Sequence, residues 1–254
     1  MNRVIVSWLE GVADGSRFAG RVLVEAVRPP FEFREMVRQL YELGVRSVPL
    51  ITAAGFAIGV VLSMHTRASL ARFGAEALIP AGLAIALVRE TGPLTAGLLL
   101  SGRIGAGIGA ELGAMKVTEQ IDALEAVAVD SFRYLVVTRV VACVIALPLL
   151  TTLMNFTGIL GGYAAETVIT GMPVETYFRQ AFTAIEFSDL IPATLKTTVF
   201  GFIIATVASY LGVNTSRGTE GVGQASTRSV VLASMLLIAT NVLLVRLIFF
   251  FYPQ

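Results

Sequence analysis

Long apolar runs separated by short polar segments make up most of the chain. Five of these runs reach about the 20 residues that an α-helix needs to cross a bilayer. They are predicted at Val45–Met64, Leu78–Leu100, Val136–Ala165, Ile191–Val213 and Val230–Tyr252. The 254 residues are 55% hydrophobic and 15% charged, whereas soluble domains carry about 25% charged residues. The pattern therefore predicts an all-α integral membrane protein with five transmembrane helices.

The segment that precedes these runs has a different pattern. Met1–Val27 places apolar side chains, Trp8 among them, on one helical face and charged side chains on the other. Arginine on the polar face is typical of a helix in the membrane interface, and packing on protein is the alternative. A pair of prolines then ends this helix. We expect one domain over 1–254, with an amphipathic interfacial (elbow) region at 1–44 and a five-span transmembrane region at 45–254.

Arginine and lysine residues lie mostly on one side of the predicted spans. If the N-terminus is cytoplasmic, thirteen of them lie on the cytoplasmic side and three on the opposite side. Because cytoplasmic loops carry an excess of these residues, the distribution predicts a cytoplasmic N-terminus. Five spans then put the C-terminus on the outer side of the membrane.

A highly charged segment, Glu111–Asp130, lies between the second and third predicted spans. Its apolar residues recur at helical spacing, so we expect a short water-exposed helix on the cytoplasmic side. Thr118 is the expected cap, with Glu119 and Asp122 in the first turn. The expected apolar stripe contains Val117, Ile121, Leu124, Val127 and Ala128. A charged helix with such a stripe is suited to docking onto another protein.

Charged residues also occur inside the apolar runs. Arg89 and Glu90 lie within the second span and Lys196 within the fourth. A charge near the centre of a span costs at least roughly 2.5–3.5 kcal/mol, so such groups face protein or a water-filled cavity. A buried ion pair of Glu90 with Lys196 or Arg89 and a functional site are compatible interpretations. Gly92 and Pro93, directly after the pair, should loosen the helix locally.

Small residues recur at every fourth position after this charged pair. On a helix they form a smooth ridge that lets another backbone approach closely. Ordinary helix packing and a moving interface are both consistent with this spacing. The ridge contains Gly97, Ser101, Gly105, Gly109 and Gly113.

Several motifs of catalytic and nucleotide-binding proteins are missing from the sequence. It has no Gly-x-x-x-x-Gly-Lys-Ser/Thr phosphate loop, no Gly-x-Ser-x-Gly elbow and no His-Glu-x-x-His helix. One cysteine, Cys143, and one histidine, His65, exclude cysteine-based zinc sites and multi-histidine metal sites. We therefore expect a chain that is not an enzyme and has no catalytic residue, metal or cofactor of its own.

Two stretches of the sequence resemble the MlaE permease family. The longer stretch, Leu87–Asp130, reads LVRETGPLTAGLLLSGRIGAGIGAELGAMKVTEQIDALEAVAVD. The other, Phe33–Leu62, reads FREMVRQLYELGVRSVPLITAAGFAIGVVL. The resemblance continues more weakly through Lys196 and residues 212–228. It implies an elbow helix and five spans, which the hydropathy indicates independently, in a multi-pass protein of a bacterial inner membrane with a periplasmic C-terminus.

The resemblance also implies a role and partners. Two copies would form the membrane core of an ABC transporter that moves glycerophospholipids between the inner and outer membranes and maintains outer-membrane lipid asymmetry. Each copy would dock a cytoplasmic ATPase, which uses ATP and Mg²⁺, through a coupling helix at Glu111–Asp130. A ring of periplasmic MCE-domain subunits, expected to be hexameric, would lie on the outer side, and a STAS-domain protein would bind the ATPase where one is present.

Site residues follow from the same resemblance. Positions matching the lipid site are Leu62, Ser69, Leu70, Phe73, Arg89, Glu90 and Lys196. Arg89 and Lys196 are candidates for contact with phosphate, and Glu90 would set the charge of the pocket or pair with one of them. Charged and polar positions of the coupling helix are Glu111, Lys116, Glu119, Gln120, Asp122 and Glu125. Thr91, Ser131 and Thr138 stand where Leu, Pro and Pro are usual in the family.

Other functions are consistent with the same residues. An ion- or proton-coupled secondary transporter of an amphipathic substrate would use Glu90 and Lys196 and need no ATPase. A permease for sterol or hydrocarbon cargo would share the fold. A membrane scaffold for other subunits would carry no lipid and would tolerate replacement of Lys196.

Overall fold

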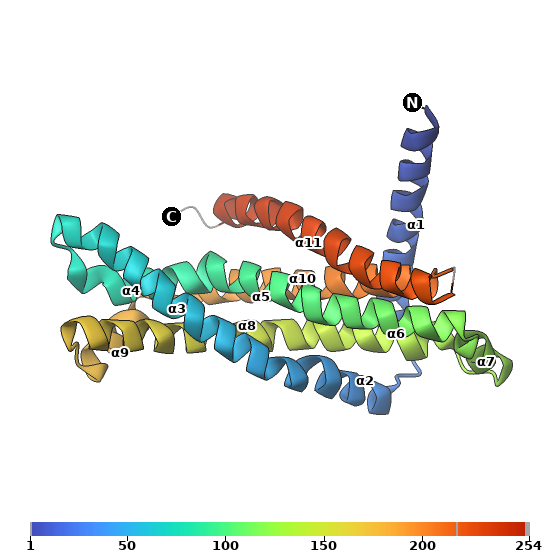
Figure 1. Ribbon diagram of the computed structural model, residues 1–254, viewed down its shortest axis with the longest axis horizontal. Helices are drawn as coiled ribbons and strands as arrows, with labels where there is room; N and C mark the ends of the chain where they lie inside the picture. The colour runs from blue at the N-terminus through green and yellow to red at the C-terminus, as the bar shows by residue number, and fades with distance from the viewer. Residues whose placement is uncertain (1, 217, 252–254) are drawn as a thin grey trace. The chain divides into compact units, whose positions relative to one another are not determined.

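The computed structural model describes residues 2–216 and 218–251, and these residues form helices and connecting turns without a strand (Figure 1). Five helical segments of the described chain are long and apolar enough to cross a membrane. They are Phe33–Phe73, Glu76–Val117, Phe132–Thr170, Phe187–Val213 and Gly218–Ile248. The five predicted spans are therefore confirmed. Each begins before its predicted start, because polar residues continue the helix beyond the apolar run. Tyr252, Met1 and the side chain of Trp8 lie outside the described part of the chain.

The α-helices are interrupted by short π-helical and 3₁₀ turns. The α-helices are α1 (Asn2–Ala26), α2 (Phe33–Gln39), α3 (Val48–Leu70), α4 (Ile79–Ala86), α5 (Gly92–Leu100), α6 (Ala106–Val117), α7 (Gln120–Ala126), α8 (Thr138–Thr170), α9 (Val174–Thr183), α10 (Phe187–Val213) and α11 (Gly218–Phe251). The π turns are η1 (Leu40–Gly44), η5 (Leu87–Thr91), η6 (Ser101–Gly105) and η7 (Phe132–Val137), and the 3₁₀ turns are η2 (Val45–Ser47), η3 (Ala71–Phe73) and η4 (Glu76–Leu78).

The helices form two compact units, each built from several segments of the chain. The first unit contains Met1–Gly44, Leu100–Ile145 and Gly201–Leu236. The second unit contains Val45–Leu99, Ala146–Phe200 and Leu237–Gln254. The long helices α8, α10 and α11 contribute residues to both units.

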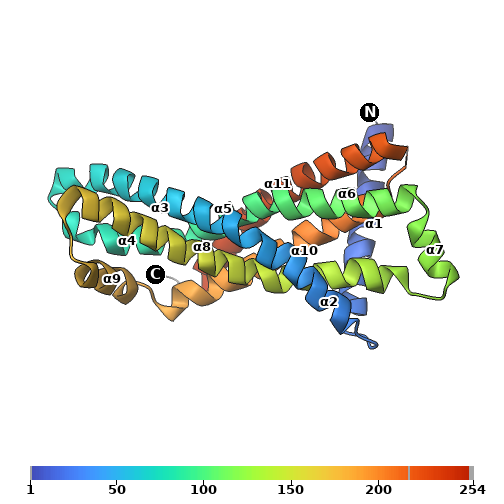
Figure 2. The same ribbon diagram turned by 60° about the horizontal axis from the view of Figure 1, so that its bottom comes forward.

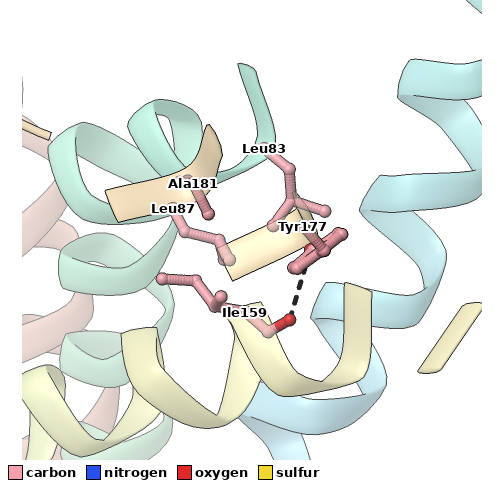
Figure 3. Close-up of a cluster of buried hydrophobic side chains, with 6 residues drawn as sticks. Leu83, Leu87, Ile159, Tyr177 and Ala181 are labelled. Carbon is pink, nitrogen blue, oxygen red and sulfur yellow. Dashed lines mark hydrogen bonds between the residues drawn. The ribbon is translucent and has the colours of Figure 1, made fainter. Parts of the chain in front are cut away.

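The second unit has an apolar core where α9 packs beside α4 (Figure 3). Leu83 and Leu87 contact Tyr177 and Ala181 of α9 there, together with Ile159 of α8. The Tyr177 hydroxyl donates to the Ile159 carbonyl at 3.2 Å. Burial raises the pKa of this hydroxyl, and the nearby Glu166 carboxylate raises it further. Helix α9 lies between the third and fourth predicted spans, and its ten residues are too few to give a long apolar run in the sequence.

The first unit holds the C-terminal part of α1 against η7. Phe18 and Phe132 pack edge to face with ring centroids 5.2 Å apart, and the Arg21 guanidinium lies 3.9 Å from the Phe132 ring centroid. Val22 is fully buried, whereas Leu23 is exposed. Part of the predicted interfacial helix is therefore packed on protein and part of it presents apolar side chains outward.

Two glycines allow α3 and α8 to approach each other closely in the second unit. A Cβ atom on Gly59 would lie 1.8 Å from the carbonyl oxygen of Gly158. The backbones touch at this point because neither residue has a side chain. In the first unit a Cβ atom on Gly109, part of the small-residue ridge, would lie 2.5 Å from Ser229 Oγ and 3.1 Å from the Ala225 carbonyl oxygen of α11. Both contacts agree with a packing role for small residues.

We expect Gly59→Ala to lower the free energy of unfolding by about 2–3 kcal/mol, because the added methyl group forces α3 and α8 apart. Gly107→Ala is the matched control, since Gly107 is helical and nothing lies within 4 Å of its Cβ position. That control should be neutral or raise stability by about 0.5–1 kcal/mol. Thermal unfolding of the two purified variants checks this, and equal midpoints would contradict the close contact.

Candidate functional site

The charged pair in the second span lies on the π-helical turn η5. Pro93 follows this turn and has no amide hydrogen, so it cannot act as the α-helical donor to the Arg89 carbonyl four residues earlier. Lys196 of α10 donates to that carbonyl, with an Nζ to O distance of 2.9 Å. The local loosening expected at Gly92 and Pro93 thus takes the form of a π turn with a carbonyl that a lysine side chain binds.

Lys196 also forms an ion pair with Glu90. The Lys196 Nζ lies 2.9 Å from Glu90 Oε1, and Asn241 of α11 donates to Glu90 Oε2 at 3.3 Å. Lys196 is 2% exposed, whereas the side chain of Glu90 is 47% exposed. Of the two pairings considered from the sequence, the structure contains the one between Glu90 and Lys196. The ammonium is enclosed by protein, whereas about half of the Glu90 side chain is exposed.

Arg89 pairs with a residue that sequence reasoning did not select. Its Nε donates to Asp189 Oδ1 at 2.6 Å, and the backbone N–H of Glu186 donates to Asp189 Oδ2 at 3.1 Å. The Asp189 side chain is 2% exposed and that of Arg89 is 36% exposed. Two ion pairs therefore hold η5 against α10 within the second unit.

The predicted lipid-site residues fall into two groups. Arg89, Glu90 and Lys196 lie together on η5 and α10. Leu62 packs against the core that contains Leu83 and Leu87, while Phe73 on η3 is 84% exposed. The other two, Ser69 and Leu70, lie in the last turn of α3, where Ser69 Oγ donates to the His65 carbonyl.

A second buried charged residue anchors the C-terminal part of α3, just before Ser69 and Leu70. Glu166 of α8 is fully buried and accepts hydrogen bonds from Ser63 Oγ at 2.8 Å and from the Arg67 guanidinium. Arg67 Nη1 also lies 3.2 Å from the Glu76 carboxylate oxygen Oε2. An unpaired carboxylate this deeply buried would be strongly unfavourable, so the pair fixes the last turn of α3 relative to α8.

Sequence reasoning missed three of these polar residues. Asp189 precedes the fourth apolar run by two residues, and Glu166 follows directly on the third. Asn241 lies inside the fifth run. A polar side chain at a span boundary or inside a span is a signal for a partner across the bundle. The sequence does not reveal which partner, because Asp189 and Arg89 are 100 residues apart.

The predicted coupling segment is divided into two helices. Helix α6 ends at Val117, and Glu119 adopts a left-handed backbone with φ 59° before α7 begins (Figure 2). The prediction of one helix capped by Thr118 is therefore wrong at this point. Thr118 Oγ1 instead donates back to the Ala114 carbonyl at 2.9 Å, and Glu119 occupies the cap position without a side-chain bond. Threonine can satisfy the preceding turn, which removes it as a cap for the next helix.

The apolar stripe of this segment is only partly covered. Ile121 is buried and Leu124 is half-buried, whereas Val127 is exposed. The polar positions Glu119, Gln120, Asp122 and Glu125 are exposed on the same short helix or its cap. An apolar edge beside exposed carboxylates is available for contact with another protein.

Ion pairs and hydrogen bonds brace both ends of the coupling segment within the first unit. Lys116 of α6 and Asp122 of α7 form an ion pair across the bend, with Nζ and Oδ1 2.9 Å apart. Glu111 accepts from the buried Arg139 of α8 at 2.8 Å. Ser131 Oγ donates to Glu125 Oε1 at 2.6 Å, so the serine at this position binds the end of α7. The six predicted coupling residues therefore lie along α6, the bend and α7.

Comparisons with known proteins identify the family of this chain. The family described as "Permease MlaE" matches residues 36–247. A "Probable ABC transporter permease protein" of Rickettsia bellii is 36% identical over 94% of this chain and 93% of its own length. The "Intermembrane phospholipid transport system permease protein MlaE" of Haemophilus influenzae is 33% identical over 85% of this chain and 84% of its own. A "Probable ABC transporter permease protein" of Synechocystis is 30% identical over 95% of this chain and 92% of its own length. With a match across nearly all of its membrane spans, the chain belongs to the MlaE permease family.

Proposed function

We propose that this chain is the membrane subunit of an ABC transporter that moves glycerophospholipids between the inner and outer membranes and so maintains lipid asymmetry. The observation that supports this most is the partly exposed pair of Arg89 and Glu90 inside an otherwise apolar span. An amphipathic lipid needs a few polar groups beside apolar walls, and charges at this depth are otherwise costly. The printed name of the Haemophilus influenzae relative supports the same cargo.

The energy for transport would come from a partner. The sequence has no phosphate loop, and α7 offers an exposed apolar edge with carboxylates. We assign this surface to a cytoplasmic ABC ATPase that hydrolyses ATP with Mg²⁺. The working unit would be a homodimer in the inner membrane, with N-termini in the cytoplasm, C-termini in the periplasm, and an MCE-domain ring on the periplasmic side. A STAS-domain subunit would bind the ATPase.

Burial divides the roles of the proposed site residues. Arg89 is exposed enough to meet a phosphate, where a guanidinium gives charge-assisted hydrogen bonds. Lys196 is enclosed and already has two acceptors, so we assign it to holding η5 in place. Leu62, Leu70 and Phe73, with Ser69 between them in the chain, would line the path of the acyl chains.

Mass spectrometry of lipids bound to the purified transporter tests this function. We expect copurified phospholipid, and we expect Phe73→Glu to reduce it at least about tenfold, because placing a carboxylate against an acyl chain costs more than 1.4 kcal/mol. Phe33→Glu is the matched control, since Phe33 is also exposed at 62% but lies on α2. Full lipid retention by Phe73→Glu would remove Phe73 from the pathway.

The Glu90–Lys196 pair also fits an ion-coupled secondary transporter, because such proteins use ionisable pairs inside the membrane. That function predicts transport driven by an ion gradient with the chain alone. We expect no gradient-driven lipid movement in vesicles that lack the ATPase, and its detection would favour this second function.

A further inference from the structure

Charge balance in the candidate site indicates which headgroup it takes. Each of the two cations is matched by a carboxylate, Arg89 by Asp189 at 2.6 Å and Lys196 by Glu90 at 2.9 Å. The formal charges of these four residues cancel. Asn241 adds a neutral amide donor to Glu90. The site therefore differs from an anion site, in which cations exceed carboxylates.

Burial decides which of these charges a ligand can meet. The side chains of Lys196 and Asp189 are nearly inaccessible, whereas those of Arg89 and Glu90 are 36% and 47% exposed. A ligand therefore meets one guanidinium and one carboxylate, which are consecutive residues of the turn η5. An incoming phosphate can contact Arg89, but it does so next to a carboxylate and in competition with Asp189.

We infer that this site, if it is the lipid site of the proposed function, selects a zwitterionic phospholipid headgroup over a net-anionic one. The phosphate of an ethanolamine headgroup would lie at Arg89 and its ammonium at Glu90. Such a headgroup adds no net charge to a neutral site surrounded by apolar helices. A glycerol headgroup adds one uncompensated negative charge, which is disfavoured where the dielectric constant is low.

Asp189 is the residue that we expect to set this selectivity. Asp189→Asn has nearly the same shape, and its amide oxygen can still accept from Arg89, although its NH2 group replaces the oxygen that accepts from the Glu186 N–H. The substitution removes one negative charge and leaves the site with a net positive charge, which should favour anionic lipid. Glu186→Gln is the matched control. It also removes one negative charge, three residues before Asp189, and the Glu186 carboxylate accepts a hydrogen bond from Ser188.

The experiment uses the complete transporter in nanodiscs that contain equal amounts of phosphatidylethanolamine and phosphatidylglycerol. After washing, native mass spectrometry counts the tightly held lipids of each class. We expect the wild type and Glu186→Gln to retain about tenfold more phosphatidylethanolamine, and we expect Asp189→Asn to bring the ratio near one.

Equal retention of both lipids by the wild type, which needs no variant, would overturn the inference while leaving the proposed function intact. An unchanged ratio in a folded Asp189→Asn transporter would overturn the role of Asp189. Failure of the wild type to retain phospholipid of either class would instead contradict the proposed function, and the headgroup inference would fall with it.

Discussion

Lys196→Met is expected to reduce lipid transport at least about tenfold and to lower stability. The substitution leaves Glu90 without its ion-pair partner and leaves the Arg89 carbonyl without the side-chain donor that Lys196 supplies. Removing one partner of a fully buried pair typically costs roughly 3–5 kcal/mol. We expect about 2–3 kcal/mol here, because the Glu90 side chain is 47% exposed and water screens part of the effect. Transport between two vesicle populations and thermal unfolding measure the two results.

A double variant separates charge balance from position. Glu90→Gln combined with Lys196→Met removes both charges together, so most of the lost stability should return. Transport should stay low, because the η5 turn still lacks its lysine contact and the exposed carboxylate is gone. Recovery of transport in the double variant would show that Lys196 acts only by balancing the charge of Glu90. Full activity of Lys196→Met itself would exclude the positioning role.

Charge reversal on the coupling helix is expected to uncouple the ATPase from the permease. Glu119 and Asp122 are exposed at the start of α7, and the exposed Lys116–Asp122 pair contributes at most about 1 kcal/mol, so changing both to Lys should leave folding nearly unchanged. Opposite charges at a docking surface steer and orient the partner, and reversing two of them should lower lipid-stimulated ATPase activity at least about tenfold. ATPase assays of the reconstituted complex, with and without lipid, measure this.

Two further variants identify the cause of such a loss. Exchanging Lys116 and Asp122 keeps the 2.9 Å pair across the bend and the net charge of the segment. If the pair were all that mattered, the exchange would retain coupling, whereas a docking role predicts that coupling is still impaired. Glu175→Lys on α9 is a control for charge reversal elsewhere, and it should have normal ATPase stimulation. Unchanged copurification and turnover of the Glu119 and Asp122 variant would exclude docking through α7.

The backbone conformation of Glu119 allows its charge to be removed without straining the bend. Its φ of 59° is strained for a residue with a side chain but readily adopted by glycine. Glu119→Gly removes the charge and relieves the backbone at the same time. This variant therefore tests the charge without distorting the bend.

Five membrane spans were predictable from the sequence because a bilayer requires about 20 apolar residues per helix, whatever the neighbouring helices are. The charged coupling segment was predictable for the related reason that its residues cannot stay in hydrocarbon. The division of this segment into two helices at Thr118 and Glu119 was not predictable from the sequence. A left-handed glutamate has no sequence signature, and local hydrogen bonding of Thr118 competes with capping.

The apolar runs of the sequence already show that Arg89, Glu90 and Lys196 lie inside membrane spans and need polar surroundings. The identity of those surroundings depends on how the helices pack. Arg89 pairs with Asp189, Lys196 binds the carbonyl next to Pro93 as well as Glu90, and Asn241 completes the group. Residues about 100 positions apart become partners through helix packing, which the spacing of apolar residues along one chain does not encode. Burial then distinguishes the enclosed Lys196 from the partly exposed Arg89.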